Sequence, residues 1–186
     1  MKLTTKEMTY VSLFAGLTAV GAFISIPLGE VPITLQTLFV LLSGLILGPK
    51  LGFLSQLVYL GLGLVGMPIF TGFTGGPQAI LKPSFGFILG FIVAAFIVGK
   101  ISHSGGKNKP TGIWVSTIVG SLIIYLLGLP YMYYILNTVM ARGMSFYAVV
   151  KMGCLLFLPG DILKLIIASI IAIKLRVNIP TSVRGS

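Results

Sequence analysis

Asp161 and Lys164 are the only charged residues in the apolar run FLPGDILKLIIASIIAI, residues 157–173, and they lie three positions apart. Residues at this spacing share one face of a helix, so the carboxylate and the ammonium group can form an ion pair. The pair could be purely structural, with Asp161 also favoured by the positive end of the helix dipole. A site that needed only stability would do as well with apolar residues, however. We therefore predict that both side chains bind a ligand.

Other polar side chains could face the same site from neighbouring segments. They are Thr34, Gln36, Gln56, Gln78, Lys82, Tyr133, Tyr134 and Asn137. Aromatic walls, directional amides and lysines that neutralise an acid suit a small, partly apolar organic ligand. An inorganic ion would need several carboxylates or unwound main-chain carbonyls, and the sequence lacks the former, with only three acidic residues.

The residues that would support other activities are missing from the sequence. Its single histidine, His103, lies in a basic linker, and its single cysteine is Cys154. No metal-ligand spacing and no phosphate-binding glycine loop is present. The net charge of +10 comes from lysines and arginines that stand between apolar runs rather than in a basic stripe. We expect no enzyme activity, no metal, no cofactor and no nucleic-acid partner, with an intramembrane enzyme as a minor alternative.

The composition indicates the elements that must position these residues. The chain of 186 residues is 56% hydrophobic and 9% charged, with a mean hydropathy of +1.06. So short a chain cannot bury that much apolar surface in water, which predicts an all-α integral membrane protein surrounded by lipid. We expect one domain over 1–186, a compact bundle of six transmembrane helices. The predicted spans are 8–27, 34–48, 51–66, 84–100, 112–140 and 159–175.

Two details of these spans bear on the site. The second and third hold about 16 residues, about 24 Å of helix, so they should lie inside the bundle or extend further. Pro130 should kink the fifth helix, which leaves 131–157 as helical pieces near one membrane face. Pro159 suits the first turn of the last helix, which places Asp161 near a membrane face.

The distribution of basic residues predicts the orientation. With the N-terminus inside, nine basic residues are internal and three are external, which favours cytoplasmic N- and C-termini. The internal ones are Lys2, Lys6, Lys50, Lys100, Lys107, Lys109, Lys174, Arg176 and Arg184, and the external ones are Lys82, Arg142 and Lys151.

The connections predicted to be external differ from the internal ones. Segments 27–34 and 66–84 are rich in Gly, Pro and uncharged polar residues, and 66–84 is long enough to act as a lid. Small residues one helical turn apart, at Ala15 and Ala19 and at Gly86 and Gly90, favour close helix packing within the bundle or against another protein.

Three stretches of the sequence resemble one family. They are GEVPITLQTLFVLLSGLILGPKLGFLSQLVYLGLGLVGMPIF at 29–70, GFTGGPQAILKPSFGFILGF at 72–91 and LPGDILKLIIA at 158–168. Together they resemble the BioY family, the biotin-binding substrate component of energy-coupling factor (ECF) transporters, over nearly the whole chain. Lys82 and Phe85 stand where that pattern leads us to expect a glycine and a small polar residue.

The resemblance implies a function and partners. The chain would capture biotin with high affinity at the outer face of a prokaryotic plasma membrane, as a multi-pass protein embedded in lipid. It would deliver biotin inward together with a transmembrane coupling protein (T component) and two ATP-binding subunits. Ala15 and Ala19 match the family feature that docks on the coupling protein.

The resemblance also assigns roles to side chains. Asp161 would accept a hydrogen bond from a ureido N–H group of biotin, and Lys164 would donate to a ureido or carboxylate oxygen. The further candidates are Tyr134 and Asn137 as pocket lining, Gln78 and Phe73 in the lid, and Gln36, Gln56 and Lys82. Three alternatives stay open: a substrate component for thiamine or riboflavin, a self-sufficient vitamin carrier, and an intramembrane enzyme. Oligomeric state and the choice between a shared and a dedicated ATPase module do not follow from the sequence.

Overall fold

Helices make up most of the computed structural model, which describes residues 3–27, 30–104 and 110–178. In chain order its elements are α1 (Thr5–Phe23), β1 (Ser25–Ile26), β2 (Ile33–Thr34), α2 (Gln36–Leu64), η1 (Pro77–Leu81), α3 (Phe85–His103), α4 (Pro110–Tyr134), η2 (Ile135–Val139), α5 (Phe146–Val150), η3 (Lys151–Leu155) and α6 (Leu158–Asn178). η1 is a 3₁₀ turn, and η2 and η3 are π-helical turns. β1 and β2 form a short antiparallel hairpin. The predicted all-α fold is confirmed.

α2 is two antiparallel arms rather than one rod. Gly48, with φ +82°, interrupts the helical backbone just before Pro49. A Cβ atom built on Gly52 would lie 3.0 Å from Cα of Gly44, whereas eight residues of straight helix span about 12 Å. The chain therefore reverses at Gly48, and the arms correspond to the predicted spans 34–48 and 51–66. Counted this way, the described residues form six helical segments in the bundle: α1, the two arms of α2, α3, α4 and α6.

The predicted break at Pro130 is wrong. α4 continues through Pro130 to Tyr134, and η2 extends it, so that Pro110–Val139 forms one apolar helix of 30 residues. Helices in membranes tolerate proline where neighbouring groups satisfy the freed carbonyl. The chain then returns through Phe146–Leu155 and Leu158–Leu175, two pieces bent by 42°. Residues 131–157 thus belong mostly to the end of the α4–η2 helix and to the α5–η3 piece that precedes α6, instead of lying along one membrane face.

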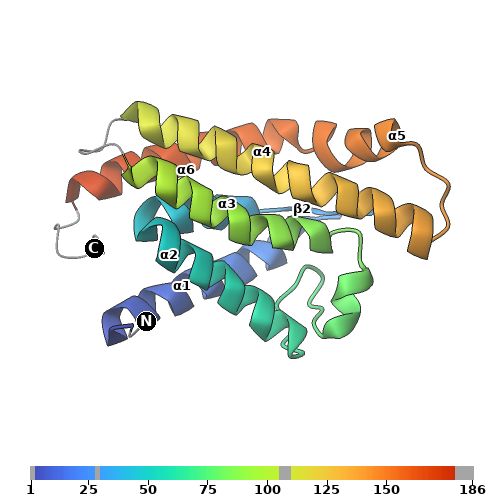
Figure 1. Cartoon of the computed structure of the whole chain (residues 1–186), viewed down its shortest axis with the longest axis horizontal. Coiled ribbons are helices and arrows are strands. Elements are labelled where there is room, and N and C mark those ends of the chain that lie inside the picture. Colours follow the sequence, from blue (N-terminus) through green and yellow to red (C-terminus); the bar gives the residue numbers. More distant parts are fainter. Residues whose placement is uncertain (1–2, 28–29, 105–109, 179–186) are drawn as a thin grey trace.

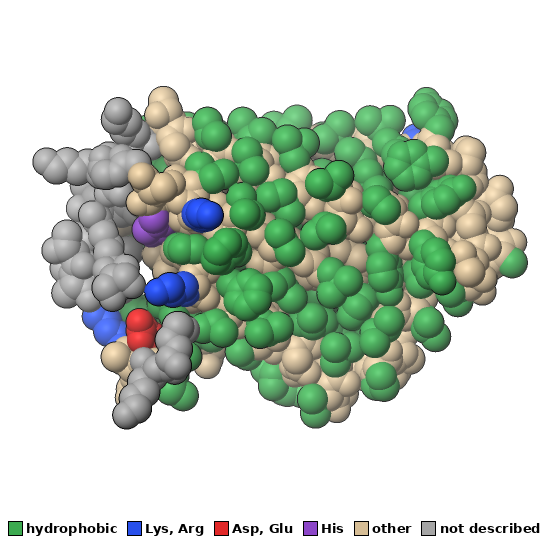
Figure 2. Space-filling view, viewed as in Figure 1, with side chains coloured by type: hydrophobic (Ala, Val, Ile, Leu, Met, Phe, Trp, Pro, Cys, Tyr) green, Lys and Arg blue, Asp and Glu red, His purple; other side chains and the backbone are tan. Residues whose placement is uncertain are grey.

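The two ends of the bundle differ. In Figure 1, α1 begins and α6 ends at the left; we call this the termini end. The turn at Gly48 lies at the last residue of α3, because a Cβ atom at Gly48 would lie 3.7 Å from the His103 ring. The β hairpin, residues 65–84 and residues 140–145 lie at the opposite end, the loop end. In Figure 2, apolar side chains cover the middle of the visible face, while most of its charged side chains gather at the termini end. Lys2, Lys107, Lys109 and Arg184 lie outside the described residues, and the cytoplasmic position of the termini stays a prediction.

Length and composition agree with a membrane environment. Three described helices are long and apolar enough to cross a bilayer, or four if the bent pair is one span. One of these three helices is α2 taken as a whole, although each of its two arms is shorter than a full membrane span. Short arms suit the interior of a bundle, and large parts of α2 are buried.

Two clusters of buried apolar residues fill the bundle. One surrounds the loop end and includes Tyr59, Phe85 and Phe91. The other fills the termini end and consists of Phe14, Leu41, Leu42, Leu45, Val98, Ile113, Ala168 and Ala172. There the turn at Gly48 and Pro49 packs against Gly99 of α3, where the backbone atoms of Pro49 leave no room for a Cβ atom.

The small-residue pairs pack within the chain itself. Ala15 and Ala19 are buried in the loop-end cluster, at 4% and 8% exposure. A Cβ atom at Gly90 would lie 3.0 Å from Cα of Ile124, and one at Gly86 would collide with Tyr131, so this pair brings α3 against α4.

Candidate functional site

A cavity lies at the loop end between α2, α3, α4 and α6, beneath the β hairpin and the 66–84 segment. The centre of a water molecule can occupy about 70 Å³ of it, which is room for several waters. Its lining is Val31, Pro32, Ile33, Thr34, Gln36, Thr37, Phe70, Thr71, Thr74, Ala79, Lys82, Ser84, Phe85, Phe87, Ile88, Phe91, Ser121, Ile124, Tyr125, Phe157, Asp161 and Lys164. Two chemically different regions, one aromatic and one polar, meet in this lining.

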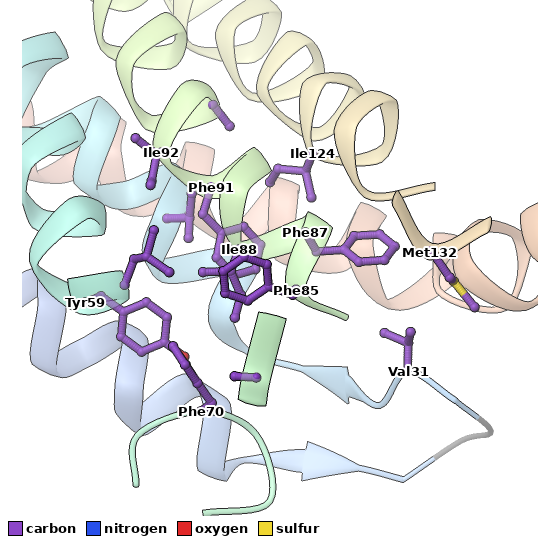
Figure 3. Packing of buried hydrophobic residues seen from close by; sticks show 14 of the residues in the cluster. Val31, Tyr59, Phe70, Phe85, Phe87, Ile88, Phe91, Ile92, Ile124 and Met132 are labelled. Atoms are coloured by element: carbon purple, nitrogen blue, oxygen red, sulfur yellow. The ribbon is translucent and has the colours of Figure 1, made fainter. Parts of the chain in front are cut away.

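The aromatic region comes mainly from the first turns of α3, with the sequence FGFILGF. Phe85, Phe87 and Phe91 are buried and line the cavity together with Ile88 and Ile124 (Figure 3). Phe70 of the 66–84 segment packs edge-on against Tyr59, with ring centroids 5.5 Å apart. This wall suits the apolar part of a ligand.

Asp161 and Lys164 form the core of the polar region. Asp161 lies in the first turn of α6, where its N–H donates to the carbonyl of Phe157 at 2.8 Å. Its carboxylate makes an ion pair with Lys164, and the two side chains are 13% and 7% exposed. Nζ of Lys164 also donates to the main-chain oxygen of Thr34 at 2.9 Å, and the hydroxyl of Tyr125 donates to Oδ2 of Asp161. The pair is thus largely buried, internally bonded and at the edge of an open cavity.

A second lysine lines the cavity from the other side. Nζ of Lys82 donates to the Thr74 hydroxyl at 3.0 Å, and none of the ion pairs found among the described residues involves Lys82. The charged groups of the lining are therefore one carboxylate and two ammonium groups. An anionic ligand would balance the excess positive charge.

Gln36 ties the cover of the cavity to α2. Its Oε1 accepts from the hydroxyls of Thr34 and Thr71 at 3.0 and 3.3 Å. Its Nε2 donates to the hydroxyl of Tyr59 at 2.8 Å, and that hydroxyl donates to the carbonyl of Ile69 at 3.2 Å. Since these bonds use much of the side chain's capacity, Gln36 mainly holds the hairpin and the 66–84 segment in place.

Two further contacts hold the cover in place. Arg142, in the segment between η2 and α5, makes an ion pair with Glu30 of the hairpin at 2.8 Å. Phe73 stacks on Phe23 at the end of α1, with ring centroids 4.5 Å apart. Each covering segment is therefore fastened to a helix or connection beside it.

The structure brings four of the nine predicted ligand-binding residues to the cavity: Asp161, Lys164, Gln36 and Lys82. Phe73 and Gln78 belong to the covering segment, but Phe73 is 67% exposed and the amide of Gln78 donates to the carbonyl of Gly75. Their predicted place in a lid agrees with this position, although neither lines the cavity.

Tyr134, Asn137 and Gln56 lie away from the cavity. Tyr134 is 58% exposed, and Asn137 exchanges two hydrogen bonds, of 3.0 and 2.6 Å, with the backbone of Met144. The unbroken α4 carries both residues beyond the cavity, because the expected kink at Pro130 does not form. Gln56 is fully buried, and its Nε2 bonds to the hydroxyls of Thr18 and Ser43 at 3.2 and 3.3 Å, which joins α1 to both arms of α2.

Tyr125, Thr71, Thr74 and Phe157 line the cavity without having been predicted. A signal existed for two of them. Tyr125 is a lone polar group in the apolar run LIIYLLGL, and polar groups within spans are candidates for function. Phe157 lies four residues before Asp161, which places it on the same helical face if the helix continues.

Comparisons with known proteins agree on one family. A family model described as the BioY family matches residues 1–181. A probable biotin transporter BioY from Pyrococcus horikoshii is 43% identical over 176 residues, which cover 95% of this chain and 99% of that protein. The biotin transporter BioY of Thermotoga maritima is 36% identical over 92% of this chain and 96% of its own length. The crystal structure of the S component for biotin from an ECF-type ABC transporter matches with a TM-score of 0.83, 26% identity and complete coverage of both chains.

Proposed function

Because the chain belongs to the BioY family, we propose that the cavity at the loop end binds biotin and that the chain is the substrate component of an ECF transporter. Its family makes it a multi-pass membrane transport protein and not an enzyme. The comparisons support biotin as the substrate because the relatives are biotin transporters, and the cavity supports it through its chemistry.

The pairing of Asp161 with Lys164 at the cavity edge carries this proposal. A cyclic urea presents an N–H donor directly beside a C=O acceptor. The carboxylate of Asp161 can accept from the N–H group while the ammonium of Lys164 donates to the oxygen, and charged hydrogen bonds of this kind are the strong ones. The aromatic wall formed by Phe85, Phe87 and Phe91 would receive the sulfur-containing ring and the aliphatic chain.

Lys82 would bind the carboxylate of biotin. The cavity lining holds one more ammonium group than carboxylate groups, and Lys82 is the lysine outside the Asp161 pair. Thr74 holds its Nζ at 3.0 Å, which leaves hydrogens for an anion, since an ammonium group has three donors. Gln36 would position the cover rather than contact biotin, because its amide is already bonded to three side chains.

The coupling protein and two ATP-binding subunits would complete the transporter in a prokaryotic plasma membrane. The family feature points to α1 as the docking helix, but Ala15 and Ala19 face the core of this chain. The exposed side of α1 carries Ser12 and Gly16, and open space surrounds Gly16. Small residues on an exposed helix face let another helix approach closely. We therefore place the docking face at Ser12 and Gly16.

Purified protein tests the proposed function directly. The protein is extracted in detergent, any co-purified biotin is removed by partial unfolding and refolding, and biotin is titrated by calorimetry. We expect one biotin per chain with high affinity, and no displacement by excess thiamine or riboflavin. Failure of the refolded protein to bind biotin, or equal displacement by another vitamin, would refute the proposal.

A further inference from the structure

Tyr125 connects two helices through the Asp161 carboxylate. It belongs to α4, whereas Asp161 and Lys164 belong to α6. Its hydroxyl donates to Oδ2 of Asp161, and Lys164 meets Oδ1. Among the described residues each carboxylate oxygen therefore has one side-chain partner, and the two partners come from different helices.

We propose that Tyr125 is a positioning residue, which fixes the rotation of the Asp161 carboxylate so that it can accept a hydrogen bond from a ureido N–H group of the ligand. This inference rests on the proposed function and deepens it. Tyr125 acts through Asp161 and sets the affinity for the urea end of the ligand.

The reason lies in the freedom of an aspartate side chain. Rotation about its second side-chain torsion is broad, so one partner on one oxygen does not fix the carboxylate plane. Without the Tyr125 hydroxyl, the carboxylate can turn and offer both oxygens to the Lys164 ammonium. A carboxylate accepts about four hydrogen bonds, and here the two internal partners leave lone pairs for a ligand. A second, fixed donor thus keeps those lone pairs directed into the cavity.

The Tyr125 ring is held independently of its hydroxyl. It packs edge-on against Phe87, with ring centroids 6.3 Å apart and planes at 88°. Its other side borders an apolar groove on the outer surface of α4, formed with Leu122, Leu126 and Phe146. Tyr125→Phe therefore removes the hydrogen bond while the ring keeps its packing.

Tyr133 provides a matched control on the same helix. It is 38% exposed, lies outside the cavity lining and packs edge-on against Phe146 with ring centroids 5.6 Å apart. Tyr133→Phe also removes one hydroxyl from α4, so it measures the general effect of that change.

The experiment measures biotin and biotin methyl ester affinities by calorimetry for the full-length protein in detergent. The variants are Tyr125→Phe, Tyr133→Phe, Asp161→Asn and the double variant Tyr125→Phe with Asp161→Asn. We expect Tyr125→Phe to weaken both ligands equally, by roughly 10-fold to 100-fold, because the Asp161 carboxylate turns away and its charged hydrogen bond to the ureido N–H group is lost. Tyr133→Phe should stay within about 2-fold of the unchanged protein.

The double variant separates positioning from general support of the helices. If Tyr125 acts through Asp161, its replacement adds less than about 3-fold to the loss caused by Asp161→Asn. A full additional loss in that background, or an unchanged affinity of Tyr125→Phe alone, would overturn the inference. If the unchanged protein itself binds no biotin, the proposed function fails instead, so the two failures are distinguishable.

Discussion

Replacing Asp161 and Lys164 together by apolar residues should abolish biotin binding without unfolding the protein. The perturbation is Asp161→Leu combined with Lys164→Met, compared with Asp161→Leu alone. A purely structural ion pair and a ligand-binding pair predict different results for these variants. The single and double variants should differ clearly in stability, because the side chains of Asp161 and Lys164 are only 13% and 7% exposed and a buried charge without its partner is costly.

The stability of each variant follows from this burial. Asp161→Leu leaves a buried ammonium group whose described partner is the carbonyl of Thr34, and breaking a buried pair in this way costs about 3–5 kcal/mol. For a chain of this size that lowers the unfolding temperature by roughly 6–20 °C. The double variant removes both charges, and such replacements are about neutral or stabilising. The carbonyl of Thr34 and the hydroxyl of Tyr125 border the cavity, where water can replace their lost partners.

The effect on binding is larger and does not recover in the double variant. Two charge-assisted hydrogen bonds to the urea contribute about 1.5–3 kcal/mol each. Their joint loss corresponds to roughly two to four orders of magnitude in Kd. Stability and affinity should therefore separate: the single variant loses both, while the double variant regains stability alone.

Two measurements on the same preparations check this result. Thermal unfolding in detergent without ligand gives the stability, and binding of radiolabelled biotin gives the affinity. The reasoning is refuted if the double variant binds biotin within about 3-fold of the unchanged protein. It is equally refuted if the double variant unfolds at the same temperature as the single variant. The loss of stability would then not come from the unpaired ammonium group of Lys164.

Three further predictions concern the rest of the lining, the docking face and the cover. Lys82→Met should weaken biotin by about 10-fold and leave biotin methyl ester unchanged in calorimetry; an equal loss for both ligands would contradict the carboxylate assignment. Gly16→Leu should retain biotin binding but lower ATP-driven uptake into vesicles containing the whole transporter, whereas Gly61→Leu, at another exposed helix position with open space, should not. Arg142→Gln removes the exposed ion pair with Glu30, so unfolding should change by less than about 1 kcal/mol while stopped-flow association and dissociation of biotin accelerate. Unchanged rates would exclude a role of this pair in holding the hairpin.

Composition and local pattern predicted the membrane class and the helical segments because these depend on neighbouring residues alone. The short spans around Gly48 became the two arms of α2 for the same reason, because an adjacent glycine and proline between two apolar runs indicate a turn. Asp161 and Lys164 were found because charge in an apolar segment is costly without a purpose.

The sequence could not distinguish uses that require the same residue type. A buried glutamine can contact a ligand or join helices, and Gln56 joins helices while Gln36 lines the cavity. The path of α4 beyond Pro130 depends on long-range packing, including the contacts of Gly86 and Gly90 of α3 with α4. The contact between Tyr125 and Asp161, 36 residues apart, depends on the relative register of two helices, which no local pattern encodes.

Which face of α1 packs inside the bundle could not be predicted from the sequence either. Neighbouring positions on a helix differ by about 100° in direction, so Ala15 and Gly16 face different surroundings. Ala15 is 4% exposed, whereas Gly16 lies on the exposed side. A pattern of small residues predicts close packing but does not say whether the neighbour is inside or outside the chain.

The contact between Gly99 and the turn at Gly48 and Pro49 bears on how a ligand could leave the cavity. Side chains can rotate aside to open a passage, but main-chain atoms in contact move only when whole helices separate. This contact and the apolar cluster that includes Leu41, Leu45 and Val98 close the termini end of the bundle. The cavity and the segments that cover it lie at the loop end. A carrier that opens alternately at two ends needs a movable gate at each end, and among the described residues the termini end would open only by separation of the Gly48–Pro49 turn from α3.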